Sequence, residues 1–365
     1  ETTGEYIYSL YLPQLSAFAE NSHESIDIVR TGLPQVTEED EDGGTITYYL
    51  IYNADQLALF RDIVNGTLTS DTDKEIYTEG ASANARLMAD IDLNPGITFN
   101  ADGTYTDGTT PAQWMPIGTS TTVYAGTFDG NNKSVSGMYI NTSEWYQGVF
   151  GRIGSSGAVH SLSLLNSSVT GGEHVGGIAG ESNGRIENCS NAASVTTVSN
   201  SHAGGIVGAC MSNSAVIANC TNSGNVKGGA YVGGIAGRSY ANITECANTG
   251  KVEGSFSYGV GGIVGITSST YSVTVKSCYN TGDITSTYKG YAYVGGIVGS
   301  FPNANARGSI ENCYNTGNVT ADAESGICSG GLFGGGYGNI SDSFSTGTVT
   351  GNTYVGGVGG FVNGT

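Results

Sequence analysis

Charged residues are scarce in this sequence, and basic residues are especially few. Charged residues make up 12% of the 365 positions, and 13 lysines and arginines stand against 32 aspartates and glutamates, for a formal net charge of −19. Nucleic-acid binding is therefore not expected, because no basic stripe is present to displace phosphate counterions. No apolar run approaches the roughly 20 residues that a membrane span needs, so direct membrane insertion is not expected either.

The cysteines and histidines lack the spacings of common metal and catalytic sites. No Cys-x-x-Cys pair occurs among the seven cysteines, which argues against a zinc site, and the odd number argues against a fully paired disulfide framework. The His-Glu-x-x-His motif of zinc peptidases is also missing, because His23-Glu24 is followed by Ser-Ile-Asp. We therefore expect no catalytic residue, no cofactor and no bound transition metal, and the chain is interpreted as not being an enzyme.

Glycine, in contrast, is abundant and periodic. The 59 glycines include Gly-Gly pairs that recur every 26 to 35 residues, within the phrase V-G-G-[IVL]-x-G. Each copy continues with [IV]-x-x-C-x-N and ends with T-G-x-[VI]. A period of this size is typical of solenoids, propellers and repeat arrays. No helical period of 3.6 residues and no Trp-Asp blade signature accompanies it, so we predict an all-β, right-handed parallel β-helix with three short strands per coil.

In a β-helix, equivalent positions of successive coils stack into columns. Three columns are predicted inside the coils: an aliphatic one, a cysteine one and an asparagine one whose amides hydrogen-bond along the axis. The aliphatic column is Ile178, Ile206, Ile235, Ile263, Ile297, Leu332 and Val358. The other two are Cys189, Cys220, Cys246, Cys278 and Cys313, and Asn191, Asn222, Asn248, Asn280 and Asn315. The thiols are interpreted as small buried apolar groups. Vertical disulfides, a redox site and capture of a soft metal remain alternatives.

A further column precedes the V-G-G phrase and is the candidate binding site. Its members are His174, His202, Tyr231, Tyr293 and Tyr354, with Tyr258 displaced by one position. Rings along an outer edge are able to receive sugar rings or protein side chains. The alternatives are an aromatic ladder that only seals a turn and a metal ion bridging the two histidines.

The chain divides into three predicted parts. Residues 1–43 have uncertain structure and include the acidic run Glu38–Asp42, for which a solvated loop is expected and a structural calcium site is the alternative. Residues 44–145 hold one short capping helix near residues 54–65, with Asn53 as its N-cap, and the first coils. Residues 124–140 are expected to form two strands around an Asp-Gly-Asn-Asn turn. Residues 146–365 are repeat coils that stop inside a copy, so the chain is expected to be a fragment of a longer protein.

The repeated phrase resembles the GLUG repeat. The chain before it resembles the lead-in that often precedes GLUG repeats, with the segments NADQLALFRDIVNG, ADIDL, WMPIG and FDGNN. The resemblance covers roughly residues 45–365. It implies a β-helical fold and a bacterial, secreted or cell-surface location, with a lipid anchor possible on a removed N-terminus. GLUG repeats occur in adhesin-like surface proteins, notably of gut Bacteroidetes, and as accessory segments of immunoglobulin-A-cleaving metallopeptidases. The resemblance carries over no catalytic residue.

The expected function is that of a non-enzymatic adhesion module, a rigid rod whose loops bind a host or matrix protein or glycan. Two alternatives remain open. One is a polysaccharide lyase or hydrolase built on a β-helix, which would need paired carboxylates on one outward face. The other is an accessory stalk of a larger surface peptidase.

Overall fold

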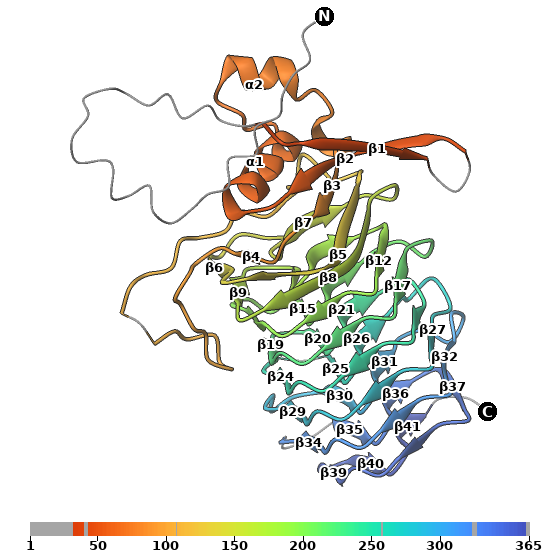
Figure 1. Cartoon of the computed structure of the whole chain (residues 1–365). Helices are drawn as coiled ribbons and strands as arrows, with labels where there is room; N and C mark the ends of the chain where they lie inside the picture. Colours follow the sequence, from red (N-terminus) through yellow and green to blue (C-terminus); the bar gives the residue numbers. More distant parts are fainter. Residues whose placement is uncertain (1–31, 40–42, 107, 257, 323–326, 363–365) are drawn as a thin grey trace, which may run out of the picture. The chain divides into compact units, whose positions relative to one another are not determined.

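Strands of successive repeats lie side by side in parallel register, which confirms the all-β solenoid (Figure 1). The computed structural model describes residues 32–39, 43–106, 108–256, 258–322 and 327–362. Most of the predicted N-terminal part, including Asp40–Asp42, lies outside these residues. Glu38 and Glu39, which were expected in a solvated loop, instead belong to a strand, β1 (Gln35–Glu39). The described chain from Leu33 onward belongs to one compact unit and forms a parallel β-solenoid of about 8 turns with two α-helices.

Each repeat coil contains five short strands rather than the three expected from sequence. The first complete coil comprises β10 (Val175–Gly176), β11 (Ala179–Ser182), β12 (Arg185–Glu187), β13 (Ser190–Asn191) and β14 (Ser194–Thr197). The extra division between β12 and β13 falls at Asn188, whose φ is 54°. The residue before the cysteine adopts this left-handed conformation in later coils as well, at Asn219, Glu245, Ser277 and Asn312, and so does Asp342, which precedes Ser343 at the equivalent position. A corner of this kind interrupts an extended strand without a glycine or proline to mark it.

The strands of the described residues form four sheets, which we number in the order in which the chain passes through them in each coil. Sheet I has seven strands: β10, β15 (His202–Gly204), β20 (Tyr231–Gly233), β25 (Gly259–Gly261), β30 (Ala292–Gly295), β35 (Ile327–Gly330) and β40 (Tyr354–Gly356). Sheet II has eight: β7 (Phe150–Ile153), β11, β16 (Val207–Cys210), β21 (Ala236–Ser239), β26 (Val264–Thr267), β31 (Val298–Phe301), β36 (Phe333–Gly336) and β41 (Gly359–Val362).

The remaining two sheets complete each coil. Sheet III contains β1 (Gln35–Glu39), β2 (Thr45–Ile51), β3 (Asn84–Leu87), β4 (Ile91–Asp92), β5 (Thr127–Ser136), β8 (Ala158–Leu165), β12, β13, β17 (Val216–Ala218), β18 (Thr221–Asn222), β22 (Ile243–Thr244), β23 (Ala247–Asn248), β27 (Thr274–Lys276), β28 (Tyr279–Asn280), β32 (Gly308–Glu311), β33 (Tyr314–Asn315), β37 (Gly338–Ser341) and β38 (Phe344–Ser345). Sheet IV contains β6 (Tyr139–Asn141), β9 (Ser168–Gly171), β14, β19 (Val226–Gly228), β24 (Val252–Gly254), β29 (Ile284–Ser286), β34 (Val319–Ala321) and β39 (Val349–Thr350).

The interior of the coils is built from the stacked columns. The aliphatic column from Ile178 to Leu332 is fully buried, whereas Val358, in the last described coil, is 48% exposed. Each asparagine from Asn191 to Asn280 donates a hydrogen bond to the next asparagine along the axis, and the column ends at Asn315. The four distances are 2.8, 2.8, 2.7 and 2.7 Å in chain order. The same amide nitrogens also donate to a carbonyl two residues ahead, as Asn248 does to Gly250 at 2.8 Å. The asparagine column therefore ties each turn both to itself and to its neighbour.

The cysteine column lies beside the asparagines as free, buried thiols. Backbone amides donate to the next sulfur along the axis, for example Cys246 N to Cys278 Sγ at 3.4 Å. Burial raises the pKa of the Cys189 and Cys246 thiols, which disfavours the reactive thiolate at these two positions. Hydrogen bonds with neighbouring thiols of the column act in the opposite direction and lower the pKa of Cys220 and Cys278. Cys210 and Cys328 lie outside this column, on sheets II and I. The geometry is that of small apolar groups filling the coil.

A helix and an antiparallel strand cover the first coil. Helix α1 (Ala54–Asn65) begins at Asn53, which accepts a hydrogen bond from Gln56 N at 3.0 Å. Its buried Phe60 packs on Phe128 at 5.9 Å between ring centroids. Strand β1 pairs antiparallel with β2 and lies at the edge of sheet III, where an open edge would otherwise pair with other chains. A second helix, α2 (Asp71–Ile76), was not predicted, because its sequence has no apolar periodicity. None of its residues is buried in the structure.

The expected pair of strands within residues 124–140 is wrong. Strand β5 instead continues through the Asp-Gly-Asn-Asn sequence and pairs in parallel with β8 on both sides of a register shift between Asp129 and Lys133. Asn131 and Asn132 take φ values of 50° and 56° there. Because β3 and β8 hold the chain on either side, the left-handed residues form an irregularity within a strand instead of reversing its direction.

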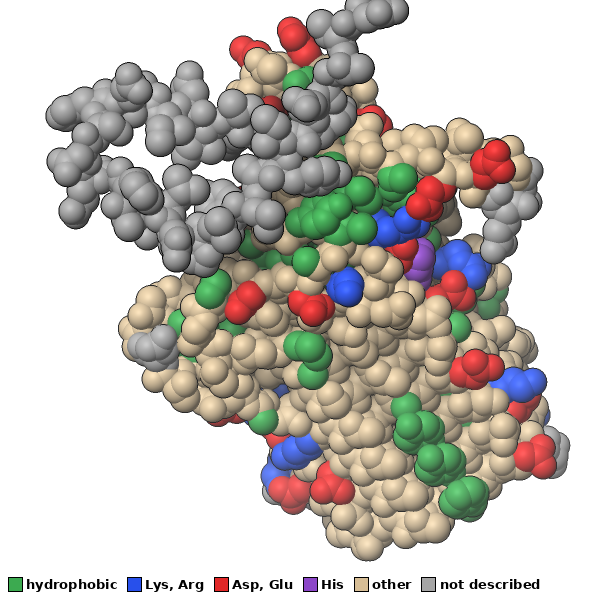
Figure 2. All heavy atoms as spheres, viewed as in Figure 1, with side chains coloured by type: hydrophobic (Ala, Val, Ile, Leu, Met, Phe, Trp, Pro, Cys, Tyr) green, Lys and Arg blue, Asp and Glu red, His purple; other side chains and the backbone are tan. Residues whose placement is uncertain are grey.

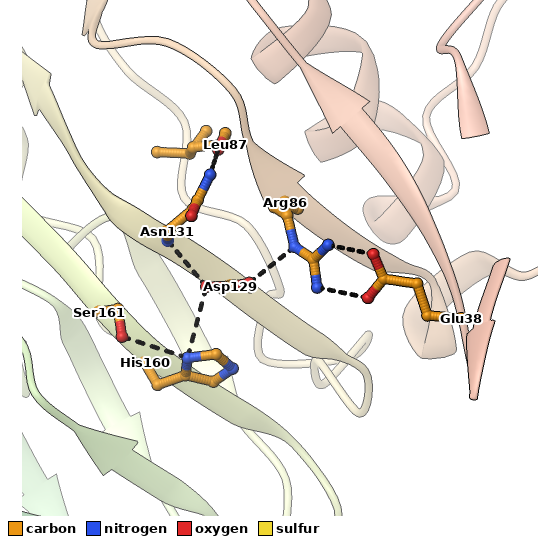
Figure 3. Close-up of polar contacts among 7 residues, drawn as sticks. All are labelled: Glu38, Arg86, Leu87, Asp129, Asn131, His160 and Ser161. Atoms are coloured by element: carbon orange, nitrogen blue, oxygen red, sulfur yellow. Dashed lines mark hydrogen bonds and ion pairs between the residues drawn. The ribbon is translucent and has the colours of Figure 1, made fainter. Parts of the chain in front are cut away.

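Charged side chains next to this irregularity join the covering strand to the first coils (Figure 3). Arg86 donates to both carboxylate oxygens of Glu38, at 2.7 and 2.9 Å, and to Asp129 at 2.7 Å. His160 Nδ1 lies 3.5 Å from the other Asp129 oxygen. The hydrogen bonds from Arg86 lower the pKa of Glu38. This row of polar residues thus fastens β1 to β3 and β5.

Candidate functional site: an aromatic groove between sheets I and II

The repeated Gly-Gly phrase makes the chain turn sharply from sheet I into sheet II. A Cβ on Gly176 would lie 2.2 Å from the carbonyl oxygen of Ala179, and one on Gly233 would lie 2.0 Å from that of Ala236. Side chains on the two sides of this bend meet, as when His174 hydrogen-bonds to Glu181 at 3.2 Å. The bend recurs along the repeats, so two rows of side chains face each other along the axis. We call the surface between these rows, which includes the hollow described below, the aromatic groove.

One side of the groove carries a continuous row of rings. The row runs in the order Tyr146, His174, His202, Tyr231 and Tyr258. The centroids of successive rings in this order are 5.2, 4.6, 5.1 and 6.2 Å apart. The structure therefore brings four of the predicted residues together. Tyr146 was missed because its coil reads Y-Q-G-V-F-G, but the bridge between Gln147 and Val175 places it at the equivalent position.

The last two predicted residues do not continue this row. In sheet I, Cys328 pairs with Tyr293 on one side and with Tyr354 on the other, so a thiol separates the two rings. Tyr293 instead contacts Tyr291, and Tyr354 contacts Phe361 across the groove at 5.3 Å. All six predicted residues border the groove, although only four of them belong to the continuous ring row.

The N-terminal half of the groove is polar. Glu181, which is 5% exposed, accepts a hydrogen bond from Arg152 at 2.7 Å and contacts His174. Burial acts to raise the pKa of this carboxyl group, but the hydrogen bonds from His174 and Arg152 outweigh it and lower the pKa. Arg152 also lies over the Tyr146 ring at 5.0 Å. Glu181 is therefore an ionised, fully engaged carboxylate.

The C-terminal half is apolar and contains a hollow of about 390 Å³. Of the predicted site residues that line this hollow, Tyr258 is the most exposed, at 51%. The ring-bearing residues around this hollow are Tyr231, Tyr258, Tyr293, Phe301, Tyr337 and Phe361. Rings that combine an apolar face with a hydroxyl group are common at binding surfaces.

A larger cleft of about 730 Å³ adjoins the N-terminal end of the groove and shares Tyr146 with it. It lies between the segments 113–120 and 140–147, and we call it the tryptophan cleft because Trp114 and Trp145 both line it. Trp145 is 55% exposed, whereas Trp114 is buried. Sequence analysis did not find this cleft, because segment 113–120 lies outside the repeats and segment 140–147 reaches only the start of their first, degenerate copy.

Another aromatic stack lies on sheet III, outside the groove. Tyr279, Tyr314 and Phe344 stack with centroids 5.0 and 5.5 Å apart and interplanar angles of 2° and 9°. Their faces are turned toward one another, so this stack resembles a packing ladder. Phe344 is as exposed as Trp145, but these three rings line neither of the two hollows described above.

The described residues contain no group of three or more His, Cys, Asp and Glu side chains that could hold a metal ion. His174 Nδ1 contacts Glu181, and His202 Nδ1 contacts the Ser201 hydroxyl. Burial lowers the pKa of His202 to about 3, with smaller contributions from His174 and Arg238. His202 is therefore neutral near pH 7 and packs as an aromatic ring.

We expect His202 to make stability depend on pH. The unfolded chain takes up a proton near pH 6.5, whereas the folded protein does so only near pH 3. The free energy of unfolding should therefore fall as the pH is lowered through this window, by up to about 1.4 kcal/mol per pH unit from this residue. His202→Tyr should reduce that slope, as measured by urea denaturation at several pH values. His160→Gln is the control, and an equal slope in wild type and His202→Tyr would contradict the assignment.

Known proteins share the repeat and the fold. The family model described as the GLUG motif matches residues 171–196, 228–253 and 290–320. Over 133 residues the chain is 34% identical to halomucin of Haloquadratum walsbyi, and over 115 residues it is 31% identical to a candidate Gly-rich membrane protein of Evansella cellulosilytica. These matches cover 35% and 30% of this chain but 1% and 12% of the relatives.

A solved structure has the same fold. It is the crystal structure of a candidate immunoglobulin A1 protease from Bacteroides ovatus, with a TM-score of 0.57, 22% identity and 84% coverage of each chain. At this identity the likeness concerns the fold alone. Within the described residues, no helix is long and apolar enough to cross a membrane. The matched segments coincide with the repeated V-G-G phrase, and the chain therefore contains GLUG repeats, which wind into a parallel β-solenoid.

Proposed function

We propose that this chain is a non-enzymatic binding module of a secreted or cell-surface adhesion protein, and that the aromatic groove is its ligand-binding surface. The observation that carries the proposal is the row of rings from Tyr146 to Tyr258, which leads from the tryptophan cleft to the apolar hollow. The GLUG repeats and the names of the relatives, a mucin and a membrane protein, support a surface location.

The charge distribution favours a neutral or basic partner, such as a host or matrix protein or a glycan without acidic groups. The sequence carries a net charge of −19, and its few cations are largely neutralised by neighbours, as Arg152 is by Glu181 at 2.7 Å. On the face drawn in Figure 2, most basic side chains lie beside acidic ones and form no basic patch. Polyanionic partners such as nucleic acids would be repelled by such a surface.

Polysaccharide cleavage by the groove has less support. A glycosidase needs two carboxyl groups, one of which acts as an acid with a raised pKa. In the groove, Glu181 has a lowered pKa and its oxygens are held by Arg152 and His174. The fold shared with the protease-like structure also favours an accessory stalk as the second candidate, in which case the groove would not need to bind a ligand.

The test is binding without turnover. The protein is applied to an immobilised panel of host glycans and extracellular-matrix proteins, and released sugars and peptides are measured in parallel. We expect binding with no product, and a loss of affinity of at least about fivefold in Tyr258→Ala. Tyr52→Ala is the matched control, because Tyr52 is also exposed, at 42%, but lies beside the covering helix. Product release, or equal binding by Tyr258→Ala and wild type, would contradict the proposal.

A further inference from the structure

We propose that the tryptophan cleft is a subsite for the neutral end of a saccharide, recognised by a sugar ring lying on Trp145 and hydroxyl groups meeting a polar rim. The inference rests on the proposed binding function, and it names the ligand class for the cleft that adjoins the aromatic groove. Its cavity of about 730 Å³ is within the range of small-molecule sites, which are typically about 300–1,000 Å³.

The cleft offers an apolar floor that other parts of the protein leave exposed to solvent. Trp145 is 55% exposed and Met115 is 52% exposed, although large apolar side chains are usually buried. The Trp145 and Tyr146 rings meet at 74° with centroids 6.2 Å apart, so they do not stack face to face on each other. An exposed indole offers a flat apolar surface with one polar N–H group, which complements the C–H face and the hydroxyl edge of a sugar ring.

The polar rim is already ordered by hydrogen bonds within the protein. Gln113 Nε2 donates to the Asn141 carbonyl oxygen at 3.2 Å, and Asn141 N donates to Gln113 Oε1 at 2.9 Å. Gln147 Nε2 donates to the Trp145 carbonyl oxygen at 2.7 Å. A rim that is fixed before binding reduces the entropy lost on association. Amide and hydroxyl groups retain unused donor or acceptor capacity, which suits sugar hydroxyls because these both donate and accept.

The charges around the cleft select against acidic sugars. Glu144 is the charged residue in its lining. The nearest cations are engaged: Arg152 pairs with Glu181 at 2.7 Å, and Arg61 pairs with Asp62 at 2.8 Å while lying over Trp114. A carboxylate or sulfate in the cleft would therefore meet Glu144 without a free counter-charge. Neutral saccharides avoid this repulsion.

Intrinsic fluorescence provides a direct test, because the chain contains 2 tryptophans and both line the cleft. The full chain is titrated with neutral oligosaccharides ending in hexose or N-acetylhexosamine, and with sialylated, uronic-acid and sulfated counterparts. We expect a saturable change in tryptophan fluorescence with at least one neutral saccharide. Its affinity should fall at least about tenfold in Trp145→Ala, and Trp145→Phe should retain part of it. Phe344→Ala removes an equally exposed ring of sheet III and should leave binding unchanged.

Glu144→Gln tests the selection by charge, and we expect it to improve binding of the acidic counterparts relative to the neutral ones. The inference is overturned if no saccharide changes the fluorescence, if Trp145→Ala binds as well as wild type, or if acidic sugars or alkylammonium ions bind better than neutral sugars. If the panel still detects binding that needs Tyr258, the proposed function stands and only the cleft assignment fails. A saturable response accompanied by released sugar would instead retain the cleft and refute the non-enzymatic function.

Discussion

Gly234→Ala should destabilise the solenoid by about 3 kcal/mol, a large effect for the addition of one methyl group. A Cβ at this position would lie 2.2 Å from the carbonyl oxygen of Gly262 in the next coil and 2.3 Å from Cγ of Asn248. Both neighbours are fixed, one by the backbone and the other by the asparagine column. Neighbouring strands are only about 4.8 Å apart, so relief of the clash requires two coils to separate.

Gly357→Ala is the matched control for this variant. Gly357 occupies the same position of the phrase in the last described coil, and a Cβ there would meet nothing within 4 Å. We expect either no change or a stabilisation of up to about 1 kcal/mol, from the reduced freedom of the unfolded chain. The comparison uses chemical denaturation with hydrogen exchange, since a repeat protein can open coil by coil. Equal effects of the two substitutions would show that packing between coils does not determine the need for glycine.

Asn248→Ala should destabilise the protein by about 4 kcal/mol. Asn248 is completely buried, donates to Asn280 at 2.7 Å and to the Gly250 carbonyl oxygen at 2.8 Å, and accepts from Asn222 at 2.8 Å. Removing its amide leaves three partners without this bond, and each buried unsatisfied group costs about 1–3 kcal/mol. The loss should exceed that of one hydrogen bond because the column is continuous.

Hydrogen exchange identifies where this loss occurs. In Asn248→Ala, we expect faster exchange of the turn amides after Asn222 and after Asn280, one coil away on either side. Asn305→Ala is the control, because Asn305 is exposed in a loop, and it should change stability by less than about 0.5 kcal/mol. If only the turn after residue 248 exchanges faster, the hydrogen bonds along the axis do not couple the coils.

The covering elements show where local sequence signals were sufficient and where they were not. The α1 helix could be predicted because Asn53, Gln56 and Gly66 mark its ends and its apolar residues recur with a helical period. Helix α2 buries no side chain and so has no such period. The Asp-Gly-Asn-Asn sequence predicts a hairpin locally, but β3 and β8 hold the chain in one strand, β5. In that case tertiary pairing overrode a turn signal.

In the aromatic groove, too, some residues could be predicted from the sequence and others depend on tertiary structure. Its ring row could be found from sequence because His174, His202 and Tyr231 occupy equivalent positions in a repeated phrase and Tyr258 lies one position away. The partners across the bend, such as Glu181 and Arg152, could not, since their approach depends on the angle at which sheet I meets sheet II. Tyr146 was hidden by a degenerate copy of the phrase.

By itself, the sequence determined the solenoid and its stacked columns, because each coil lies against a near copy of itself and equal positions must then align. Tertiary structure alone decided the corner that divides β12 from β13, the polar and apolar halves of the groove, and the tryptophan cleft. The cleft, for example, brings residues 113–120, which lie outside the repeats, together with residues 140–147. Their meeting depends on the path of the backbone around a coil, which the periodic pattern does not encode.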